Sequence, residues 1–549
     1  MSLQILVGIF FGGLVLLWPA TVAGEDRYVY LNWTVEYGVV SPLNVKQRGI
    51  LINGQFPGPT VNVTTNDNVI VNLENKLDEP LLLTWNGVKQ RKSSWQDGVL
   101  GTNCPIPPGS NWTYRMQMKD QIGTHTYFPS TAMHRVAGGY GGFNILARSV
   151  IPVPYPKPFG EFTVLVSDWW NEDHKVVQRI LDSGRPLPMP NGLLINGKAN
   201  ATFFDAVPGK RYLFRVSNIG ITASINFRIQ NHTLVLVECE GSHPLQRAYD
   251  SFDLHVGQSS SFLVTVGKAG AYFVVASTRF TKPTLTVTGI LHSRGSGATG
   301  ATVSETAAAT APGPLPAGQT YQIHWSMKQA RSIRLNLTAN AARPNPQGTF
   351  HYGMIPVVRT IVLQNKAAAI NGKLRYAVNG VSYINPDTPL KLADYYNIAG
   401  VFILNSIPDN PPPAGTPAVL NTSVLGTTLH DFVEIVFQNN ESTVQSWHMD
   451  GHSFWAVGFG CGKWNSTLRE EYYNYHDAVV RHTIQVYPHS WSAIMVSLDN
   501  KGMWNLRSGV WGRRYLGQEL YVRVWDDQQS VTTEYDIPDN AFFCGKAKH

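Results

Sequence analysis

The sequence predicts an all-β protein made of about three β-sandwich domains. Apolar and polar residues alternate over short segments, a pattern typical of strands that bury one face, and long amphipathic helices are scarce. The clearest alternating segments are residues 61–73, 212–216 and 433–437. The length of 549 residues favours about three domains, since a usual domain has 100–150 residues.

An internal repeat supports this division. Ile-Asn-Gly occurs at residues 52–54 and 195–197, and Val-Asn-Gly occurs at 378–380, each time between alternating apolar segments. Asn-Gly between two such segments is typical of a tight turn joining two strands. Because each third of the chain contains one such turn, we expect a β-sandwich in each third.

The N-terminus predicts a secretory signal peptide at residues 1–24. Residues 5–18 form an apolar run that is short for a membrane span, and small residues follow at Ala20, Ala23 and Gly24. This segment carries no charged side chain, so the formal net charge of +7 belongs to the mature chain. We expect a secreted, extracellular and basic protein.

Nine N-x-S/T patterns agree with export and predict N-glycosylation. The candidate acceptors are Asn32, Asn62, Asn111, Asn200, Asn231, Asn336, Asn421, Asn440 and Asn465. Residues 542–549 contain no apolar tail of the kind that a glycolipid anchor needs. We therefore expect neither a membrane span nor an anchor.

Composition divides the mature chain further. The first domain is predicted at residues 25–155 and ends in a stiff Pro-rich connector at 152–158. The second is predicted at 156–292. Residues 293–318 are rich in Gly, Ala, Thr and Pro and poor in large apolar groups, which predicts an exposed, flexible loop. The third domain is predicted at 319–549.

The stretch Gln445–His452 carries metal-ligand chemistry. In an extended strand, His448, Asp450 and His452 would share one face, while Trp447 and Met449 would take the other. Two imidazoles and a carboxylate suit a single Zn, Cu or Fe ion. The alternative is that the three are strand residues satisfied by hydrogen bonds.

This stretch resembles the third copper motif of plant multicopper oxidases, and the residues that flank the ligand positions of the other three motifs are also present. Trp85-Asn86-Gly87, Gly123-Thr124-His125-Thr126-Tyr127 and Gly509-Val510-Trp511 introduce them. Flanking residues that are kept around substituted ligands closely resemble the pattern of the ascorbate-oxidase-like, or monocopper-oxidase-like, plant proteins. The eleven positions that hold copper in the family are here Thr84, Asn86, Phe128, Ser130, Gln445, His448, Asp450, Arg514, Tyr515, Leu516 and Leu520.

The resemblance implies three cupredoxin-like domains and an altered chemistry. Only His448 keeps a family ligand, and the type-1 copper positions hold Gln445, Tyr515 and Leu520 without any thiolate. We therefore expect no laccase or ascorbate oxidase catalysis and no cofactor; copper enters by family analogy alone. In the family, the positions of Ser130, Asp450 and Arg514 hold one copper ion, so we predict an Arg514–Asp450 ion pair there, with Ser130 as a further acceptor.

The four cysteines are too widely spaced for a zinc knuckle or a redox pair. The resemblance implies a disulfide between Cys104 and Cys544. Cys239 and Cys461 are either buried free thiols or a second bridge.

Two classes of function remain open. The first is a secreted, non-catalytic glycoprotein of the plant apoplast that acts in cell-wall expansion, directional growth or pollen-tube growth, as the resemblance implies. The second is an oxidoreductase with a reduced copper or other metal complement, and the sequence leaves open whether the chain is an enzyme. Basic charge and export favour an acidic wall polysaccharide such as pectin as partner, whereas no nucleic-acid-binding motif is present.

Overall fold

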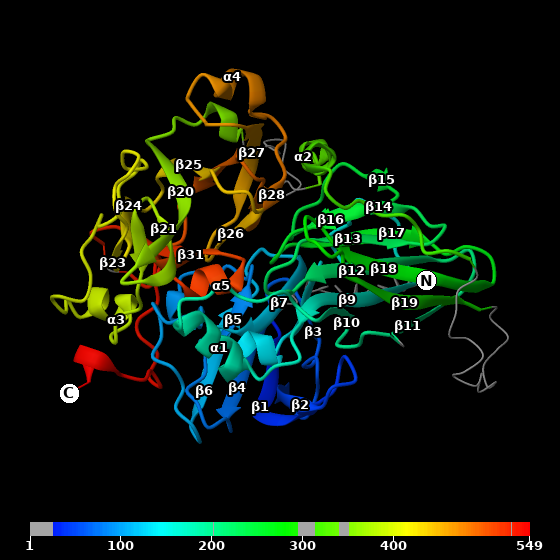
Figure 1. The fold of residues 1–549 in the computed structure, drawn as a ribbon, viewed down its shortest axis with the longest axis horizontal. Coiled ribbons are helices and arrows are strands. Elements are labelled where there is room, and N and C mark those ends of the chain that lie inside the picture. Colours follow the sequence, from blue (N-terminus) through cyan, green and yellow to red (C-terminus); the bar gives the residue numbers. More distant parts are fainter. Residues whose placement is uncertain (1–25, 201, 295–312, 340–350, 529, 549) are drawn as a thin grey trace, which may run out of the picture.

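The computed structural model describes residues 26–200, 202–294, 313–339, 351–528 and 530–548 (Figure 1). The predicted signal peptide and most of the predicted loop at 293–318 lie outside these residues. The described chain forms six sheets. The all-β prediction is therefore confirmed.

Two four-stranded sheets form the first sandwich. Their inward side chains, among them Val35, Val63 and Val71, share one core with Trp85 and Tyr127. The first sheet has the order β2 (Gln47–Ile52), β1 (Tyr28–Val40), β4 (Asn68–Asn75) and β6 (Asn111–Gln117). The second has the order β3 (Val61–Thr64), β8 (Gly141–Leu146), β7 (Gly123–Pro129) and β5 (Leu83–Asn86).

The second sandwich pairs a six-stranded with a five-stranded sheet. The larger has the order β10 (Gly192–Ile195), β9 (Gly160–Trp169), β12 (Arg211–Asn218), β17 (Ser259–Thr265), β14 (Leu234–Cys239) and β15 (Arg247–Tyr249). The smaller has the order β11 (Phe203–Ala206), β19 (Thr286–Ser293), β18 (Gly270–Thr278), β13 (Ile225–Ile229) and β16 (Phe252–Leu254). Aromatic residues such as Phe214, Phe227 and Phe262 fill the space between them.

The third sandwich is the largest. One sheet has the order β23 (Val419–Asn421), β22 (Val381–Tyr383), β21 (Lys373–Val378), β20 (Arg359–Ile370), β25 (Phe432–Asn439), β30 (Ser490–Ser497), β27 (Phe454–Cys461) and β28 (Val480–Arg481). The other has the order β24 (Val424–Thr428), β32 (Glu519–Trp525), β31 (Gly502–Ser508), β26 (Gln445–Met449) and β29 (Thr483–Val486). Each of the six sheets thus draws its strands from one third of the chain.

The three predicted Asn-Gly turns are confirmed, and they share one arrangement. Both residues of each turn have positive φ, as a type I′ turn requires: Asn53 50° and Gly54 71°, Asn196 49° and Gly197 76°, and Asn379 45° and Gly380 83°. Each asparagine side chain also accepts a hydrogen bond from a backbone N–H of a distant strand residue: Thr34 to Asn53 at 2.8 Å, Leu165 to Asn196 at 2.7 Å and Gln364 to Asn379 at 2.8 Å. The sequence repeat therefore corresponds to a repeated hydrogen bond that attaches each turn to a strand of the same sandwich.

Helices are short and lie between or at the edges of the sheets. They are α1 (His174–Asp182), α2 (Ile323–Ser332), α3 (Leu390–Tyr395), α4 (Leu468–Tyr472) and α5 (Trp511–Tyr515), with 3-10 turns η1 (Ser94–Gln96), η2 (His134–Ala137), η3 (Tyr352–Met354) and η4 (Gly545–Ala547). No helix among the described residues is long and apolar enough to cross a membrane.

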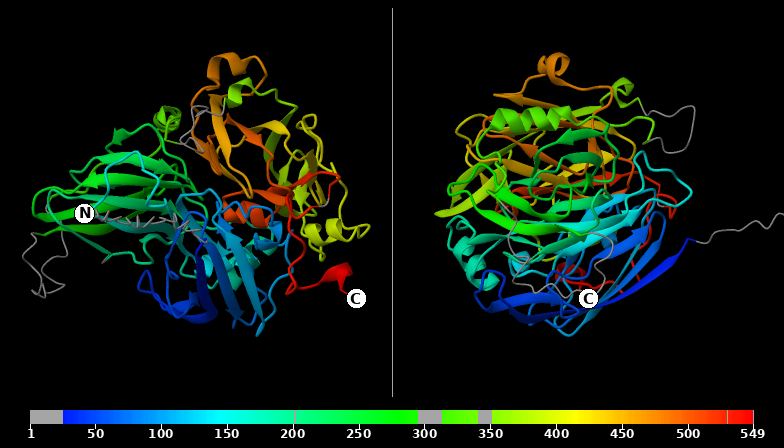
Figure 2. Two further views of the ribbon diagram at one scale, coloured as in Figure 1. Left: turned by 180° about the vertical axis from the view of Figure 1, so that it is seen from behind. Right: turned by 90° about the vertical axis from the view of Figure 1, so that its right-hand side faces the viewer.

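The three sandwiches meet around α5. An apolar cluster at this junction joins Phe128 of β7, Leu165 of β9, Val177 of α1 and Trp511 of α5. Figures 1 and 2 show α5 near the middle of the molecule, between the blue first sandwich and the yellow-to-orange third one. Side chains from all three thirds of the chain therefore meet at one place.

Candidate functional site

His448 is held in the middle of a three-stranded arrangement. Its strand, β26, lies between β29 and β31, and His448 stands opposite Thr483 on one side and Arg507 on the other. His448 Nδ1 lies 2.8 Å from Thr483 Oγ1, and His448 Nε2 lies 2.9 Å from Asp450 Oδ1. Burial, aided by the charge of Arg507, lowers the pKa of His448 to about 4. The imidazole is therefore neutral at neutral pH, and both of its nitrogens already have partners.

Asp450 forms a buried ion pair, but with Arg507 rather than with Arg514. Both side chains of the Asp450–Arg507 pair are 2 % exposed. Burial would raise the pKa of Asp450, but the Arg507 guanidinium outweighs it and holds this pKa well below its usual range. The predicted Arg514–Asp450 pair is wrong because Arg507, standing opposite His448 on the neighbouring strand, contacts the carboxylate itself.

Arg514 joins a second buried ion pair at the same junction. Its Nε donates to Glu519 Oε2 at 3.1 Å, and its Nη1 donates to the backbone carbonyl of Ser130 at 2.8 Å. The contact of Arg514 with Ser130 was expected, although the acceptor is the main chain and not the hydroxyl. Asn505 connects the two pairs, since it donates to Glu519 at 3.0 Å and accepts from Arg507 at 3.2 Å.

Asp97 is a further carboxyl of this network. It is fully buried, and burial together with the negative charge of Asp450 raises its pKa well above the usual value. The network thus sets the carboxyl groups of Asp450 and Glu519 against the guanidinium groups of Arg507 and Arg514, with the Asp97 carboxyl beside Asp450. Paired charges of this kind are stable in a buried place where single charges are not.

At the first two copper motifs, Asn86 and Ser130 form hydrogen bonds within the protein, whereas the buried Thr84 hydroxyl has no hydrogen-bond partner among the described residues. Thr84 of β5 stands opposite Phe128 of β7. Asn86 donates to a backbone carbonyl at 3.2 Å, and Ser130 donates to another at 2.5 Å. The guanidinium of Arg135 lies 3.8 Å from the centre of the Phe128 ring, which is a cation–π distance.

The type-1 copper positions are dispersed among unrelated contacts. The side-chain amide oxygen of Gln445, Oε1, accepts a hydrogen bond at 3.1 Å from Gln518 Nε2. The Tyr515 hydroxyl donates to Asp182 of α1 at 2.8 Å, while Leu520 is buried in an apolar cluster. Leu516, a ligand position outside the type-1 set, is also buried in an apolar cluster. No sulfur ligand takes part, so the blue-copper donor set is not present.

Copper of the family kind does not fit these residues. Of the eleven ligand positions only His448 keeps its family residue, and Arg514, itself a cation, stands at another. The predicted single-metal site is not formed either: His452 Nδ1 lies 3.3 Å from the backbone oxygen of Asp450 rather than beside its carboxylate. Among the described residues, the one group of three or more His, Cys, Asp or Glu whose ligand atoms lie within 4.8 Å of one another surrounds Glu79, not His448, Asp450 and His452.

The predicted disulfide between Cys104 and Cys544 is confirmed. Their Cα atoms lie 5.9 Å apart, and the bridge connects positions 440 residues apart in the chain. It fastens the C-terminal segment to the first sandwich. Of the two open alternatives for the other cysteines, the first holds: both are free thiols. Cys239 is buried as expected, whereas Cys461, at the end of β27, is exposed.

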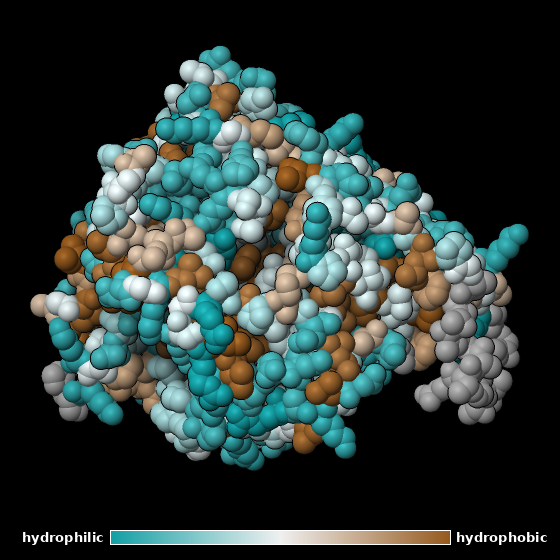
Figure 3. Space-filling view, in the orientation of Figure 1, coloured by the Kyte–Doolittle hydropathy of each residue, from teal (hydrophilic) through white to brown (hydrophobic). Residues whose placement is uncertain are grey.

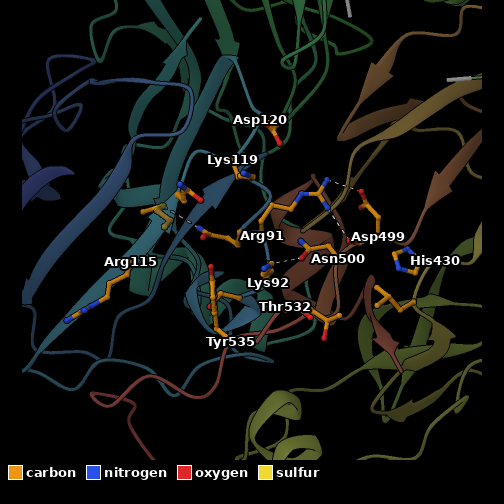
Figure 4. A pocket seen from close by; sticks show the side chains of 16 residues that line it. Arg91, Lys92, Arg115, Lys119, Asp120, His430, Asp499, Asn500, Thr532 and Tyr535 are labelled. Atoms are coloured by element: carbon orange, nitrogen blue, oxygen red, sulfur yellow. Dashed lines mark hydrogen bonds and ion pairs between the residues drawn. The ribbon is translucent and has the colours of Figure 1, made fainter. Parts of the chain in front are cut away.

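A polar cavity opens between the first and third sandwiches, next to the C-terminal segment (Figure 4). Its volume is about 470 Å³. Its lining includes four Arg or Lys side chains and two Asp side chains, an excess of two positive charges. Arg91 is paired with Asp499 at 2.9 Å, whereas Lys92 lies 5.7 Å from the centre of the Tyr535 ring. Lys119, also on the lining, is exposed.

The predicted acceptor asparagines are accessible. Seven of the nine, all but Asn336 and Asn421, are exposed, and these two are half-buried. On the face shown in Figure 3, hydrophobic residues are scattered among hydrophilic ones.

Sequence reasoning did not single out Arg507, Asn505, Glu519 or Asp97. One signal was available for Arg507 and Asn505. They lie two residues apart in a strand, so they share a face, and polar groups on a face that is otherwise apolar indicate a buried polar network. Their partners come from other elements and could not be read from spacing.

Comparisons with known proteins agree with this description. Three family models described as multicopper oxidase match residues 34–150, 160–296 and 387–530. An L-ascorbate oxidase homolog of Nicotiana tabacum is 48% identical over 98% of this chain and 97% of its own length. The monocopper oxidase-like protein SKU5 of Arabidopsis thaliana is 46% identical over 99% of this chain and 93% of its own length.

Among solved structures, Fet3p, a multicopper oxidase that functions in iron import, superposes with a TM-score of 0.73. At 20% identity over 91% of this chain and 90% of that one, the likeness shows a shared fold of cupredoxin-like sandwiches. The family models and the near-complete match to plant relatives show the family of the chain. The chain belongs to the multicopper oxidase family, and its similar relatives are plant ascorbate oxidase homologues and monocopper oxidase-like proteins.

Proposed function

We propose that this chain is a secreted glycoprotein of the plant apoplast that has lost laccase and ascorbate oxidase chemistry and binds acidic wall polysaccharide. In that role it acts in cell-wall expansion, directional growth or pollen-tube growth. The observation that carries the loss of chemistry is the buried network of Arg507, Asp450, Arg514 and Glu519. Two members of this network, Asp450 and Arg514, stand at positions that hold copper ligands in the family, which supports the proposed loss of chemistry.

The partner follows from charge and shape. The mature chain is basic, with a formal net charge of +7, and the cavity around Lys92 and Lys119 has an excess of two positive charges. Pectin that has lost its methyl esters carries one carboxylate per sugar, so it supplies the matching charge at regular intervals. The half-exposed Tyr535 ring offers an apolar face against which a sugar ring packs.

Oxidase chemistry is tested on protein purified from a plant secretory source. We expect a colourless solution and no oxygen uptake with ascorbate or phenols, because no thiolate is available at the type-1 positions. A cucumber-type ascorbate oxidase purified in parallel serves as the positive control. An intense blue absorption with stoichiometric copper would contradict this part of the proposal.

Polysaccharide binding is tested by retention on de-esterified pectin at increasing salt. We expect retention at low ionic strength that weakens towards 1 M salt, since the Debye length falls from about 10 Å at 0.1 M to about 3 Å at 1 M. Lys92→Gln with Lys119→Gln should elute at lower salt. The matched control, Lys328→Gln with Lys366→Gln, removes two exposed lysines outside the cavity. Equal loss in both double variants means that overall charge, not the cavity, is responsible.

The alternative, an oxidoreductase with a reduced metal complement, has one observation in its favour. His448 and Asp450 remain in contact at 2.9 Å. Oxygen uptake that depends on an added metal and disappears in His448→Gln would favour this alternative over the binding function.

A further inference from the structure

Glu79 lies at the joint between the first sandwich and α1, outside every copper position of the family. It follows β4, and two histidines face it: His134, the first residue of η2, and His174, the first residue of α1. The side chains of His134 and His174 are 1% and 0% exposed, and that of Glu79 is 22% exposed. The two imidazoles are therefore shielded, and the carboxylate closes the group towards solvent.

The distances match those of a metal site. Glu79 Oε2 lies 3.4 Å from His134 Nε2, and Glu79 Oε1 lies 3.2 Å from His174 Nε2. Ligand atoms that are each 2.0–2.1 Å from a tetrahedral ion lie about 3.3 Å from one another. The ligand atoms of all three residues lie within 4.8 Å of one another. Little rearrangement separates this geometry from that of three ligands around one ion.

The far side of each imidazole faces a polar side chain. Nδ1 of His134 lies 3.3 Å from Thr131 Oγ1, and Nδ1 of His174 lies 3.5 Å from Asp173 Oδ1. Nδ1 of His174 is buried without a hydrogen-bond partner. Metal-ligating histidines usually direct the other ring nitrogen at a carboxylate, carbonyl or water. With an ion on Nε2, the Nδ1–H of His174 would face Asp173.

A neutral His174 cannot satisfy both of its neighbours. It carries one N–H, yet carboxylate oxygens lie on both sides of the ring, from Asp173 and from Glu79. Without a cation, one nitrogen lone pair faces a carboxylate or stays unsatisfied. A cation between Nε2 and Glu79 removes this conflict, because it accepts electron pairs from both.

Two groups compete for Glu79. Lys175 Nζ lies 2.8 Å from Oε1, and the Tyr37 hydroxyl donates to the same oxygen at 2.5 Å. The Lys175 side chain is 33% exposed and also contacts an exposed aspartate, so it can move into solvent. A metal ion would replace it as the positive partner of Glu79.

We propose that Glu79, His134 and His174 bind one divalent transition-metal ion of the Zn²⁺ or Cu²⁺ kind and thereby fasten α1 to the first sandwich. Two imidazoles and a carboxylate suit these ions, and a fourth position is open to water. The site is independent of the lost copper cluster, so its presence leaves the proposed loss of oxidase chemistry unaffected.

The test uses the full secreted chain, treated with a chelator and dialysed. Isothermal titration with ZnCl₂, and separately with CuCl₂, should show one strong site, and added Zn²⁺ should raise the Tm. His134→Gln and His174→Gln should each abolish this site and the rise in Tm. His255→Gln, which removes a buried histidine outside both sites, is the matched control and should retain both. Near-UV circular dichroism verifies that each variant is folded.

A further variant leaves the ligands intact. Lys175→Gln removes the competing cation from a partly exposed position, so Zn²⁺ should bind about tenfold more tightly, equivalent to about 1.4 kcal/mol. A structural hydrogen-bond network around Glu79 predicts no such gain. Absence of a strong site in the wild type, retention of the site in His134→Gln and His174→Gln, or unchanged affinity in Lys175→Gln would each overturn the proposal.

Discussion

The Asp450–Arg507 pair allows a direct test of which arginine neutralises the carboxylate at a family copper-ligand position. Both side chains are 2% exposed. Arg507→Met leaves the Asp450 carboxylate buried with His448 as its remaining side-chain hydrogen-bond partner. Breaking a buried pair by removing one member costs about 3–5 kcal/mol, because the other charge stays without compensation. We therefore expect a loss of this size in the free energy of unfolding.

A double-mutant cycle isolates the interaction. Asp450→Asn removes the other charge, and the double variant should lose less than the sum of the single variants by about 2–3 kcal/mol. The control cycle combines Asp450→Asn with Arg514→Met. Because Arg514 pairs with Glu519 instead, this cycle should show a coupling below about 1 kcal/mol.

The assay is urea unfolding followed by tryptophan fluorescence, with midpoints compared for the same transition at unchanged slope. Additive effects of Asp450→Asn and Arg507→Met would refute the assignment of this pair. So would an equal coupling energy of Asp450 to both arginines, because the structure pairs Arg514 with Glu519 instead.

Two more predictions concern acid and reduction. Burial lowers the pKa values of His448 and His452 to about 4. Between this value and the ordinary pKa near 6.5, the unfolded chain binds more protons than the folded one, so stability is full above pH 6.5 and is lost as the pH falls towards 4. Each histidine contributes at most about 3 kcal/mol to this loss. The urea midpoint should fall as the pH is lowered from 7 to 4.5, and it should fall less in His448→Gln. A fall in that variant as large as in the wild type would contradict the lowered pKa of His448. Replacing Cys104 and Cys544 with serine should cost about 2–5 kcal/mol because the bridge spans 440 residues; peptide mapping that finds both thiols free in the native protein would contradict the bridge.

The substitution of the family's copper ligands could be determined from the sequence alone. A ligand must carry a suitable donor atom, so leucine or phenylalanine at a ligand position cannot bind copper whatever the geometry. The same holds for the fold class, because alternation with a period of two and paired Asn-Gly turns are local properties of the chain. Asn53, Asn196 and Asn379 show this: each turn follows from two adjacent residues.

Only the tertiary structure decided which side chains surround Asp450. The ion-pair prediction chose Arg514 for Asp450, but an arginine side chain is long enough to reach several carboxylates, and strand register placed Arg507 opposite His448. The group around Glu79 was hidden for the same reason. Its members come from a loop, a 3-10 turn and a helix, separated by 55 and 95 residues from Glu79, and no spacing rule connects them. Local patterns report what neighbours in sequence do, whereas contacts between distant side chains depend on how three sandwiches pack against one another.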